Sequence, residues 1–252
     1  MKIPNFKKMN ETELRQKIRK LIKEKTTMRN IVLLTAAGHG ERLGLSIPKQ
    51  WQKIDGVSIT EHTLRKFLAV ESIDRILVLY NKENLLDAQS LLHLNSKVSI
   101  LEGGRSAQET RDIGLKAVAA ADDDNIIIHD AVRPMVSTQL IREVLSRAQD
   151  ADAIVPILKN RDTLFDVRNF RQIYSYDTVR TQTPQLFKYG AIMKAFGRAR
   201  EENIFDTFYS PFELLNHYGY RLNFIDGDLL NFKITYPQDI EYFRKLKDVS
   251  AK

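Results

Sequence analysis

The sequence of 252 residues contains no cysteine, which excludes disulfide bonds, thiolate nucleophiles and zinc sites built from cysteine. It also lacks any apolar run of about 18 residues, and its lysine-rich first residues contain no apolar stretch typical of a secretory signal. We therefore expect no membrane span and a cytoplasmic location. Hydrophobic residues make up 43% of the chain, which is enough to build a substantial core without disulfides.

Positive charge is concentrated at the start of the chain. Residues 1–29 hold ten Lys or Arg and three Glu, which accounts for the whole formal net charge of +7. Asn10 and Glu13 have the polarity of a helix start, and the apolar residues that follow at helical spacing are Leu14, Ile18, Leu21 and Ile22. We predict a basic amphipathic helical extension over residues 1–28 that packs on the domain or a neighbouring subunit, with contact to a membrane surface or polyanion as the alternative. Because the rest of the chain is charge-balanced, nucleic acid is not an expected partner.

From Asn30 onward, short apolar runs alternate with amphipathic segments. The runs that predict strands are Ile31–Thr35, Ile76–Tyr80, Val98–Leu101, Ile126–His129 and Ala153–Ile157. The segments that predict helices are Thr60–Ala69, Lys82–His93, Ser106–Ala119 and Thr138–Gln149. This alternation is typical of a mostly parallel sheet flanked by helices, so the predicted fold class is α/β. No repeat or low-complexity linker interrupts it, and we expect one domain over residues 29–252.

Residues 158–178 have no helical period and mix polar residues with single apolar ones. They predict an excursion from the sheet, and two alternatives stay open: a protruding β-arm that reaches a partner subunit, and a surface loop. The segments predicted as helices after this excursion are Lys188–Arg200, Pro211–Tyr218 and Pro237–Lys247. Extended chain is predicted over Arg221–Ile225 and Asn231–Thr235.

The stretch after the first predicted strand is rich in small residues, namely Ala36, Ala37, Gly38 and Gly40. Small residues let the backbone approach a polyphosphate closely, so that consecutive N–H groups can bind the anion. Arg42 and Lys49 add positive charge to the same stretch. A dinucleotide fingerprint requires glycine where Leu43 stands, and a Walker loop requires Gly-Lys followed by Ser or Thr, so neither applies. We interpret residues 36–50 as a phosphate loop of another kind; a sharp structural turn is the alternative for the glycines alone.

Asp130 ends another predicted strand, within the segment His129-Asp130-Ala131-Val132-Arg133-Pro134. Ligands in open α/β sheets collect beyond the carboxyl ends of the strands. A carboxylate is the hard oxygen ligand that Mg²⁺ requires when it bridges nucleotide phosphates, so Asp130 is a predicted metal ligand. For His129 we favour a buried ring satisfied by a backbone partner, and for Arg133 a structural ion pair.

Two further features carry possible chemistry. Gly103 and Gly104 follow a strand and precede a helix that contains Thr110, so they either accept a base or ribose against bare backbone or only make the turn. Lys233 is a lone cation in an apolar segment, where burial without an anionic partner would cost several kcal/mol. Its predicted partner is either a ligand phosphate or a nearby Asp or Glu.

Taken together, these segments resemble the 2-C-methyl-D-erythritol 4-phosphate cytidylyltransferases and the related ribitol-5-phosphate cytidylyltransferases over nearly all of residues 30–247. The matching motifs are the Ala-Ala-Gly-Xaa-Gly-Xaa-Arg loop, Pro48-Lys49-Gln50, Gly103-Gly104 with Gly114-Leu115, the segment from His129 to Pro134, Asp162-Thr163, Gln182-Thr183-Pro184-Gln185 and Asn231 to Thr235. The ordered coincidence of so many motifs makes the resemblance specific.

The resemblance implies a Rossmann-like nucleotidyltransferase fold and a homodimer that exchanges the arm around residues 158–178. It also implies Mg²⁺-dependent transfer from CTP to a polyol phosphate, with release of pyrophosphate. The residues implied to bind the nucleotide are Ala36, Ala37, Gly38, Gly40, Gly103, Gly104 and Thr110. The residues implied in catalysis are Arg42 and Lys49 at the leaving pyrophosphate and Lys233 at the α-phosphate. Asp130 is implied to bind metal and substrate.

The residues expected around the acceptor depart from the resemblance. Thr183 is a predicted substrate-binding residue, but Ser175 stands eight residues before it, where the erythritol-phosphate enzymes carry Arg. Tyr209 begins a segment that stands where the family has a Thr-Asp pair, unless Asp206-Thr207 substitutes for that pair through a shifted loop. We keep Ser175 and Tyr209 as candidate acceptor-binding residues in a rebuilt pocket.

A third departure lies near the cytidine site. Ala107 stands at a position where the family usually has Arg, although Arg105 and Arg111 are close. The leading hypothesis is a cytidylyltransferase that converts CTP and a polyol phosphate to a CDP-polyol. The alternative is a nucleotide-binding protein with a degenerate acceptor site and no transferase activity.

Overall fold

The computed structural model describes residues 28–38 and 47–249. The predicted helix within residues 1–28 lies outside the described residues, except for Met28, and so do Gly40 and Arg42. In the described part of the chain, no helix is both long and apolar enough to cross a membrane.

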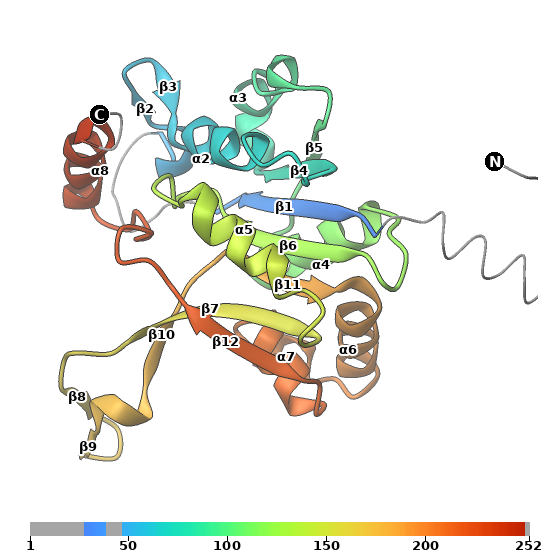
Figure 1. The fold of residues 1–252 in the computed structure, drawn as a ribbon, viewed down its shortest axis with the longest axis vertical. Helices are drawn as coiled ribbons and strands as arrows, with labels where there is room; N and C mark the ends of the chain where they lie inside the picture. Colours follow the sequence, from blue (N-terminus) through green and yellow to red (C-terminus); the bar gives the residue numbers. More distant parts are fainter. Residues whose placement is uncertain (1–27, 39–46, 250–252) are drawn as a thin grey trace, which may run out of the picture.

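An eight-stranded sheet forms the centre of the fold (Figure 1). Its strands are β1 Asn30–Ala36, β4 Arg75–Tyr80, β5 Val98–Glu102, β6 Asn125–Asp130, β7 Ala153–Lys159, β10 Val179–Thr181, β11 Gln185–Lys188 and β12 Leu222–Asp226. Their order is β10-β7-β11-β6-β1-β4-β5, and β12 pairs with β7. Strands β6, β1, β4 and β5 run parallel, whereas β11 runs antiparallel to both β6 and β7. The prediction of a mostly parallel sheet is confirmed.

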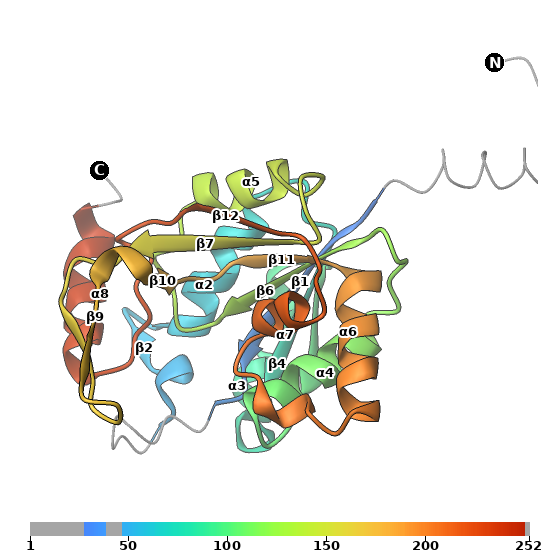
Figure 2. The same cartoon turned by 90° about the horizontal axis from the view of Figure 1, so that it is seen from below.

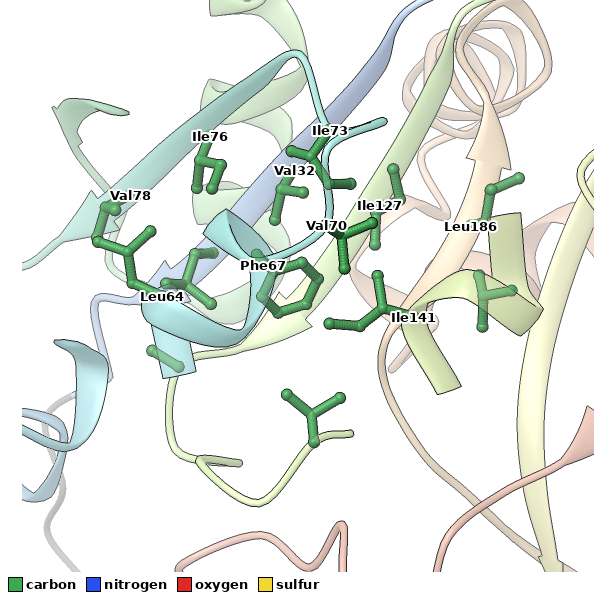
Figure 3. Close-up of a cluster of buried hydrophobic side chains, with 14 of the residues drawn as sticks. Val32, Leu64, Phe67, Val70, Ile73, Ile76, Val78, Ile127, Ile141 and Leu186 are labelled. Atoms are coloured by element: carbon green, nitrogen blue, oxygen red, sulfur yellow. The ribbon is translucent and has the colours of Figure 1, made fainter. Parts of the chain in front are cut away.

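Helices cover both faces of this sheet (Figure 2). On one face lie α2 Ile59–Leu68 and α5 Thr138–Ser146, and on the other lie α4 Ala107–Ala117, α6 Tyr189–Glu201 and α7 Pro211–His217. Alternate residues of β1, β4 and β6 contribute to the two cores, because successive side chains of a strand point to opposite faces. Figure 3 shows the first core, in which Phe67 of α2 packs among Val32, Ile127 and Ile141.

Serine residues set where three of the covering helices begin. Ser58, Ser106 and Ser137 each accept a hydrogen bond from the backbone N–H three residues further on, at the start of α2, α4 and α5. Such a cap satisfies one of the free N–H groups of the first turn and stabilises a helix by about 1 kcal/mol. The predicted starts of these helices lie within one residue of the observed ones.

Two predicted elements are wrong. The helix predicted over Lys82–His93 is split into the 3-10 turn η3 Lys82–Asn84, the short helix α3 Leu85–Gln89 and the turn η4 Leu92–Leu94. The Ser90 hydroxyl donates to the backbone oxygen of Asp87, a local bond that competes with helix continuation. The segment Asn231–Thr235 is not a strand, because its backbone bonds the ends of other elements: Ile234 N–H donates to Val132 O at 2.9 Å.

The excursion at residues 158–178 is an arm rather than a plain surface loop. Strands β8 Leu164–Asp166 and β9 Arg171–Ile173 form a separate antiparallel hairpin, which Figure 1 shows protruding from the body of the fold. The turn η5 Ser175–Asp177 leads from the hairpin back to β10. The predicted protruding β-arm is therefore confirmed.

Smaller elements close the carboxyl edge of the sheet. The turn η2 Lys49–Trp51 precedes a hairpin of β2 Lys53–Ile54 and β3 Val57–Ser58, and η6 Phe205–Thr207 precedes α7. The last helix, α8 Pro237–Val249, packs Phe243 against Ile54 and Ile59 in a third apolar cluster. This packing holds the C-terminal segment, which carries Lys233, at the same edge as the end of β1.

Candidate functional site

A cavity of 370 Å³ lies where the strand order changes direction. From β1 the chain continues to β4 and β5 on one side, and later returns to place β6 on the other side of β1, with Thr35 opposite Asp130. Open α/β sheets bind ligands at such a switch point, beyond the carboxyl ends of the strands. The residues that line the cavity are Thr35, Ala36, Ala37, Gly38, Lys49, Gln50, Gly104, Arg105, Ser106, Ala107, Thr110, Arg111, Asp130, Val132 and Lys233.

The start of the predicted phosphate loop is fixed by a buried amide. Gln50 in η2 is only 2% exposed, and its Nε2 donates to the backbone oxygen of Ala36 at 3.0 Å and to that of Gly38. The preceding residue, Lys49, is 9% exposed and lines the cavity. Gln50 therefore holds the residues that follow β1 against the turn that carries Lys49. Gly40 and Arg42 of the same loop lie outside the described residues.

The turn between β5 and α4 leaves no room for a side chain at Gly103. A Cβ there would lie 2.7 Å from Ala37 Cβ and 3.0 Å from Thr110 Oγ1. The Thr110 hydroxyl accepts a hydrogen bond from Gly104 N–H at 3.0 Å. These contacts bring the predicted nucleotide-binding residues of two separate segments against each other, at the wall of one cavity.

Asp130 is the centre of a charge cluster at the cavity wall. Its Oδ2 lies 3.2 Å from Lys233 Nζ and 3.0 Å from Arg133 Nε, and its backbone N–H donates to Thr183 Oγ1 at 3.1 Å. Burial would raise the pKa of Asp130, but the nearby Lys233 and Arg133 lower it well below its ordinary value. The ion pair predicted for Arg133 is confirmed, and of the two partners considered for Lys233 the structure provides the carboxylate.

Long-range hydrogen bonds position the segment that carries Lys233. Asn231 is fully buried, and its Nδ2 donates to the backbone oxygen of Thr183 at 2.7 Å. Arg133 Nη1 and Gln182 Nε2 both donate to the backbone oxygen of Asn231, at 2.8 and 3.2 Å. The sequence analysis did not predict that the side-chain amides of Gln182 and Asn231 position this segment. The signal in the sequence that could have indicated it is the presence of these polar residues within motifs predicted to be buried.

His129 is fully buried beside this cluster, with its ring centroid 4.9 Å from that of Phe67. Burial, partly opposed by the charge of Asp130, lowers the pKa of His129 from its ordinary value to about 3, so the ring is neutral at neutral pH. The predicted burial is confirmed. The predicted backbone partner is not: neither ring nitrogen forms a hydrogen bond in the described part of the chain, although Arg133's backbone lies close enough to influence the pKa.

Of the three candidate acceptor residues, Thr183 contacts Asp130 of the cavity wall, but Ser175 and Tyr209 do not line the cavity. The Tyr209 side chain is 94% exposed, and Ser175 lies on the arm; neither lines the cavity. The alternative pair Asp206-Thr207 is exposed in η6. Sequence reasoning noted Arg111 only as a neighbour of Ala107, whereas the structure places both in the cavity wall.

The side chains of the cavity wall are compatible with a metal ion that bridges phosphates. Within residues 28–38 and 47–249, no group of three or more His, Cys, Asp or Glu could hold a metal ion without other ligands. Mg²⁺ is usually bound through one or two carboxylates together with waters and substrate phosphates. A lone carboxylate at the cavity wall, Asp130, fits that pattern.

Residues 30–244 match the family described as 2-C-methyl-D-erythritol 4-phosphate cytidylyltransferase. A relative of that name from Thermotoga neapolitana is 30% identical over 217 residues, covering 85% of this chain and 95% of the relative. The bifunctional ribulose 5-phosphate reductase/CDP-ribitol pyrophosphorylase Bcs1 of Haemophilus influenzae is 32% identical over 230 residues, covering 86% of this chain and 48% of that protein. The crystal structure of the 2-C-methyl-D-erythritol 4-phosphate cytidylyltransferase of Francisella tularensis has a TM-score of 0.75 and 26% identity, covering 86% of this chain and 99% of that one. This chain belongs to the 2-C-methyl-D-erythritol 4-phosphate cytidylyltransferase family.

Proposed function

We propose that the chain transfers the cytidylyl group of CTP to the phosphate of a polyol phosphate. An oxygen of the acceptor phosphate attacks the α-phosphorus of CTP, the bond from that phosphorus to the bridging oxygen breaks, and pyrophosphate leaves. The acceptor oxygen is already anionic near neutral pH, so positioning and charge neutralisation are sufficient for catalysis. The observation that carries the proposal is the cavity in which Lys49, Asp130 and Lys233 meet the start of the phosphate loop.

The nucleotide occupies the wall formed by the first strand and the start of α4. The backbone of Ala36, Ala37, Gly38 and Gly40 receives the phosphates, and Gly103, Gly104 and Thr110 hold the cytidine. The close packing of Gly103 on Ala37 supports this division, since it brings both segments to one ligand. Arg42 and Lys49 neutralise the departing pyrophosphate.

Lys233 and Asp130 lie at the reacting centre. Lys233 contacts the α-phosphate, and the carboxylate of Asp130 keeps this cation oriented in the cavity wall through their 3.2 Å contact. Asp130 would also hold Mg²⁺, which would supply positive charge at the phosphate oxygens. The low pKa of Asp130 supports this role, because the carboxylate is ionised over the whole physiological range.

The acceptor is a small polyol phosphate. The names of the relatives include both 2-C-methyl-D-erythritol 4-phosphate and CDP-ribitol. The Thr183 hydroxyl accepts a hydrogen bond from Asp130 N–H, which places Thr183 beside the part of the cavity wall that contains Asp130. Ser175 and Tyr209 complete the acceptor site when the arm of a second copy approaches.

The functional unit is a homodimer that pairs through the arm. The arm exposes apolar side chains that have no packing partner in the described part of the chain beyond their own hairpin, among them Val167 at 74%, Phe170 at 83% and Tyr176 at 79% exposure. Phe165 packs edge-on against Phe170 and Tyr174 stacks on Tyr176, which supports a preformed apolar surface. The cytoplasmic location expected from the composition stays a prediction.

Pyrophosphate release tests the proposal. The protein is incubated with CTP and MgCl₂ and with ribitol 5-phosphate, 2-C-methyl-D-erythritol 4-phosphate or glycerol 3-phosphate in turn, with UTP as the control nucleotide. We expect release with CTP and at least one of these acceptors. Calorimetric binding of CTP without release for every acceptor would support the alternative, a nucleotide-binding protein with a degenerate acceptor site, which the exposed Tyr209 and the remote Ser175 motivate.

A further inference from the structure

Arg111 is a cation in the cavity wall that has no role in the reaction proposed above. It follows Thr110 on α4 and lines the same 370 Å³ cavity as Lys49 and Lys233. Its Nη1 donates to Gln108 Oε1 at 3.3 Å and to the backbone oxygen of Tyr209 at 3.2 Å. The guanidinium therefore bridges α4 and the loop that precedes α7, at the side of the cavity where the candidate acceptor residue Tyr209 lies.

The charge of this guanidinium is incompletely compensated. Both of its hydrogen-bond acceptors are neutral, and no carboxylate forms an ion pair with it among the described residues. Burial lowers the pKa of Arg111, and the charge of Asp130 opposes that shift without cancelling it. Asp130 is already bonded to Lys233 and Arg133.

An anion in the cavity would complete these interactions. Arg111 is partly buried, so water compensates its charge only in part, and Arg normally stays charged, which leaves room for an anionic partner in the cavity. The Nε and Nη2 groups make no hydrogen bond within the described part of the chain, so both remain available. A guanidinium binds phosphate through two parallel N–H bonds, whereas a neutral hydroxyl would leave its charge unbalanced.

Of the two anionic substrates, the acceptor fits this position better. In the proposed reaction Lys49 serves the pyrophosphate and Lys233 the α-phosphate, so CTP already has its cations. The acceptor phosphate has to reach the same α-phosphate, and the repulsion between the two anions requires a further positive charge between them or beside them. Arg111 supplies that charge in the cavity wall that also holds Asp130, where it bonds the backbone oxygen of Tyr209.

We propose that Arg111 binds the phosphate of the acceptor and orients its attacking oxygen, so that this residue selects phosphorylated polyols. This inference rests on the proposed cytidylyl transfer and adds a specificity-determining residue to it. The residue also fastens the Tyr209 loop to α4, so the experiment has to separate binding from a purely structural contribution.

The test compares Arg111→Gln and Arg111→Lys with Lys116→Gln. Lys116 lies on the same helix, is 57% exposed and does not line the cavity, so its loss is a matched removal of one positive charge. For Arg111→Gln we expect the KM of the acceptor to rise about 30-fold, because a charge-assisted hydrogen bond is lost. The KM of CTP is expected to change less than about threefold, and Arg111→Lys to recover part of the loss.

A binding measurement decides the inference even without turnover. Inorganic phosphate is titrated into the wild-type protein and the variants in the presence of Mg²⁺ and a non-hydrolysable CTP analogue, and its affinity is followed by calorimetry. We expect Arg111→Gln to weaken phosphate binding about tenfold or more, with Lys116→Gln unchanged. Equal phosphate affinity in wild type and Arg111→Gln, or a parallel rise of both KM values together with a lower melting temperature, would reduce Arg111 to a structural residue. Failure of all acceptors to react, with this difference in phosphate affinity intact, would instead overturn the transfer reaction alone.

Discussion

The cavity wall built by β1, η2 and α4 differs from the arm in where its contacts are made. In the cavity wall, buried groups such as Gln50 and Thr110 satisfy backbone atoms of the same chain, and Gly103 packs against Ala37 with no space left. On the arm, Phe170 and Tyr176 are 83% and 79% exposed. The comparison teaches that the cavity wall is closely packed within one copy of the chain, whereas the arm leaves apolar surface uncovered, to which the proposed function assigns the pairing of two copies.

We expect the largest effect on turnover from removing a positive charge in the cavity wall. Lys49→Ala should lower turnover about 10²- to 10³-fold, because loss of one preorganised charge-stabilising group typically raises the barrier by about 3 kcal/mol. Arg42→Ala is expected to act in the same direction. The measurement is the rate of pyrophosphate release at saturating CTP, with Lys53→Ala, an exposed lysine of β2, as the control. Rates near wild type for both Lys49→Ala and Arg42→Ala would remove the assigned roles and with them the basis of the comparison.

A smaller effect is expected from the Gln50 amide, which bonds the start of the predicted phosphate loop. Gln50→Glu replaces the donor to Ala36 O and Gly38 O with a carboxylate, which leaves two carbonyl oxygens unsatisfied and repelled. We expect the free energy of unfolding to fall by about 2 kcal/mol, and the KM of CTP to rise. Gln89→Glu, on the exposed surface of α3, is the matched control in urea denaturation. If the two variants proved equally stable, the loop would not depend on this clamp.

The buried ring beside Asp130 makes the cavity side sensitive to acid. Because the pKa of His129 is lowered to about 3 in the folded state, the unfolded chain binds more protons than the folded chain between about pH 6.5 and pH 3. Stability is therefore lost as the pH falls through this window, by about 2 kcal/mol at pH 5. Urea denaturation at pH 7 and pH 5 should show this loss in the wild-type chain and a smaller one in His129→Phe. The same pH dependence in both proteins would assign the effect to other groups.

On the arm side, a single polar substitution should act on assembly rather than on folding. Phe170 adopts a positive φ of 49°, a conformation that Asp tolerates better than most residues, so Phe170→Asp is compatible with the hairpin. We expect the dissociation constant of the dimer, measured by sedimentation equilibrium, to rise at least about tenfold, as burial of the introduced charge in the dimer opposes association. The melting temperature at low protein concentration should stay unchanged.

Leu86→Asp, an equally exposed apolar position on α3, serves as its control and should leave the dimer intact. A wild-type chain that sediments as a monomer at every concentration would contradict the pairing through the arm. It would also remove the proposed distinction between the cavity wall and the arm.

The parts of the structure that the sequence predicts are those encoded by neighbouring residues. The central strands β1, β4 and β6 are apolar runs buried on both faces, and helix starts follow from serine caps such as Ser106 and Ser137. The phosphate loop and the glycine pair were recognisable for the same reason, since small residues directly follow a strand in each case. The register Thr35 to Asp130 then places the ends of β1 and β6 side by side.

The features that escaped prediction depend on partners far away in the chain. Asn231–Thr235 reads as a strand because its apolar residues alternate, yet its backbone bonds Val132 and its Asn231 side chain bonds Thr183. Arg111 is indistinguishable from a surface arginine of a helix until the Tyr209 carbonyl is brought to it from a residue 98 positions later. Ser175 lies in η5 on the arm and does not line the cavity, so its predicted contact with the acceptor stays a prediction.

The position of bound nucleotide tests the central claim most directly. A crystal structure of the wild-type protein with Mg²⁺ and a non-hydrolysable CTP analogue should show the triphosphate in the 370 Å³ cavity, with Lys49 at its β- and γ-phosphates and Lys233 at the α-phosphate. Nucleotide bound elsewhere, for example in the groove at the opposite edge of the sheet lined by Asp122, Lys188 and Arg221, would contradict the account.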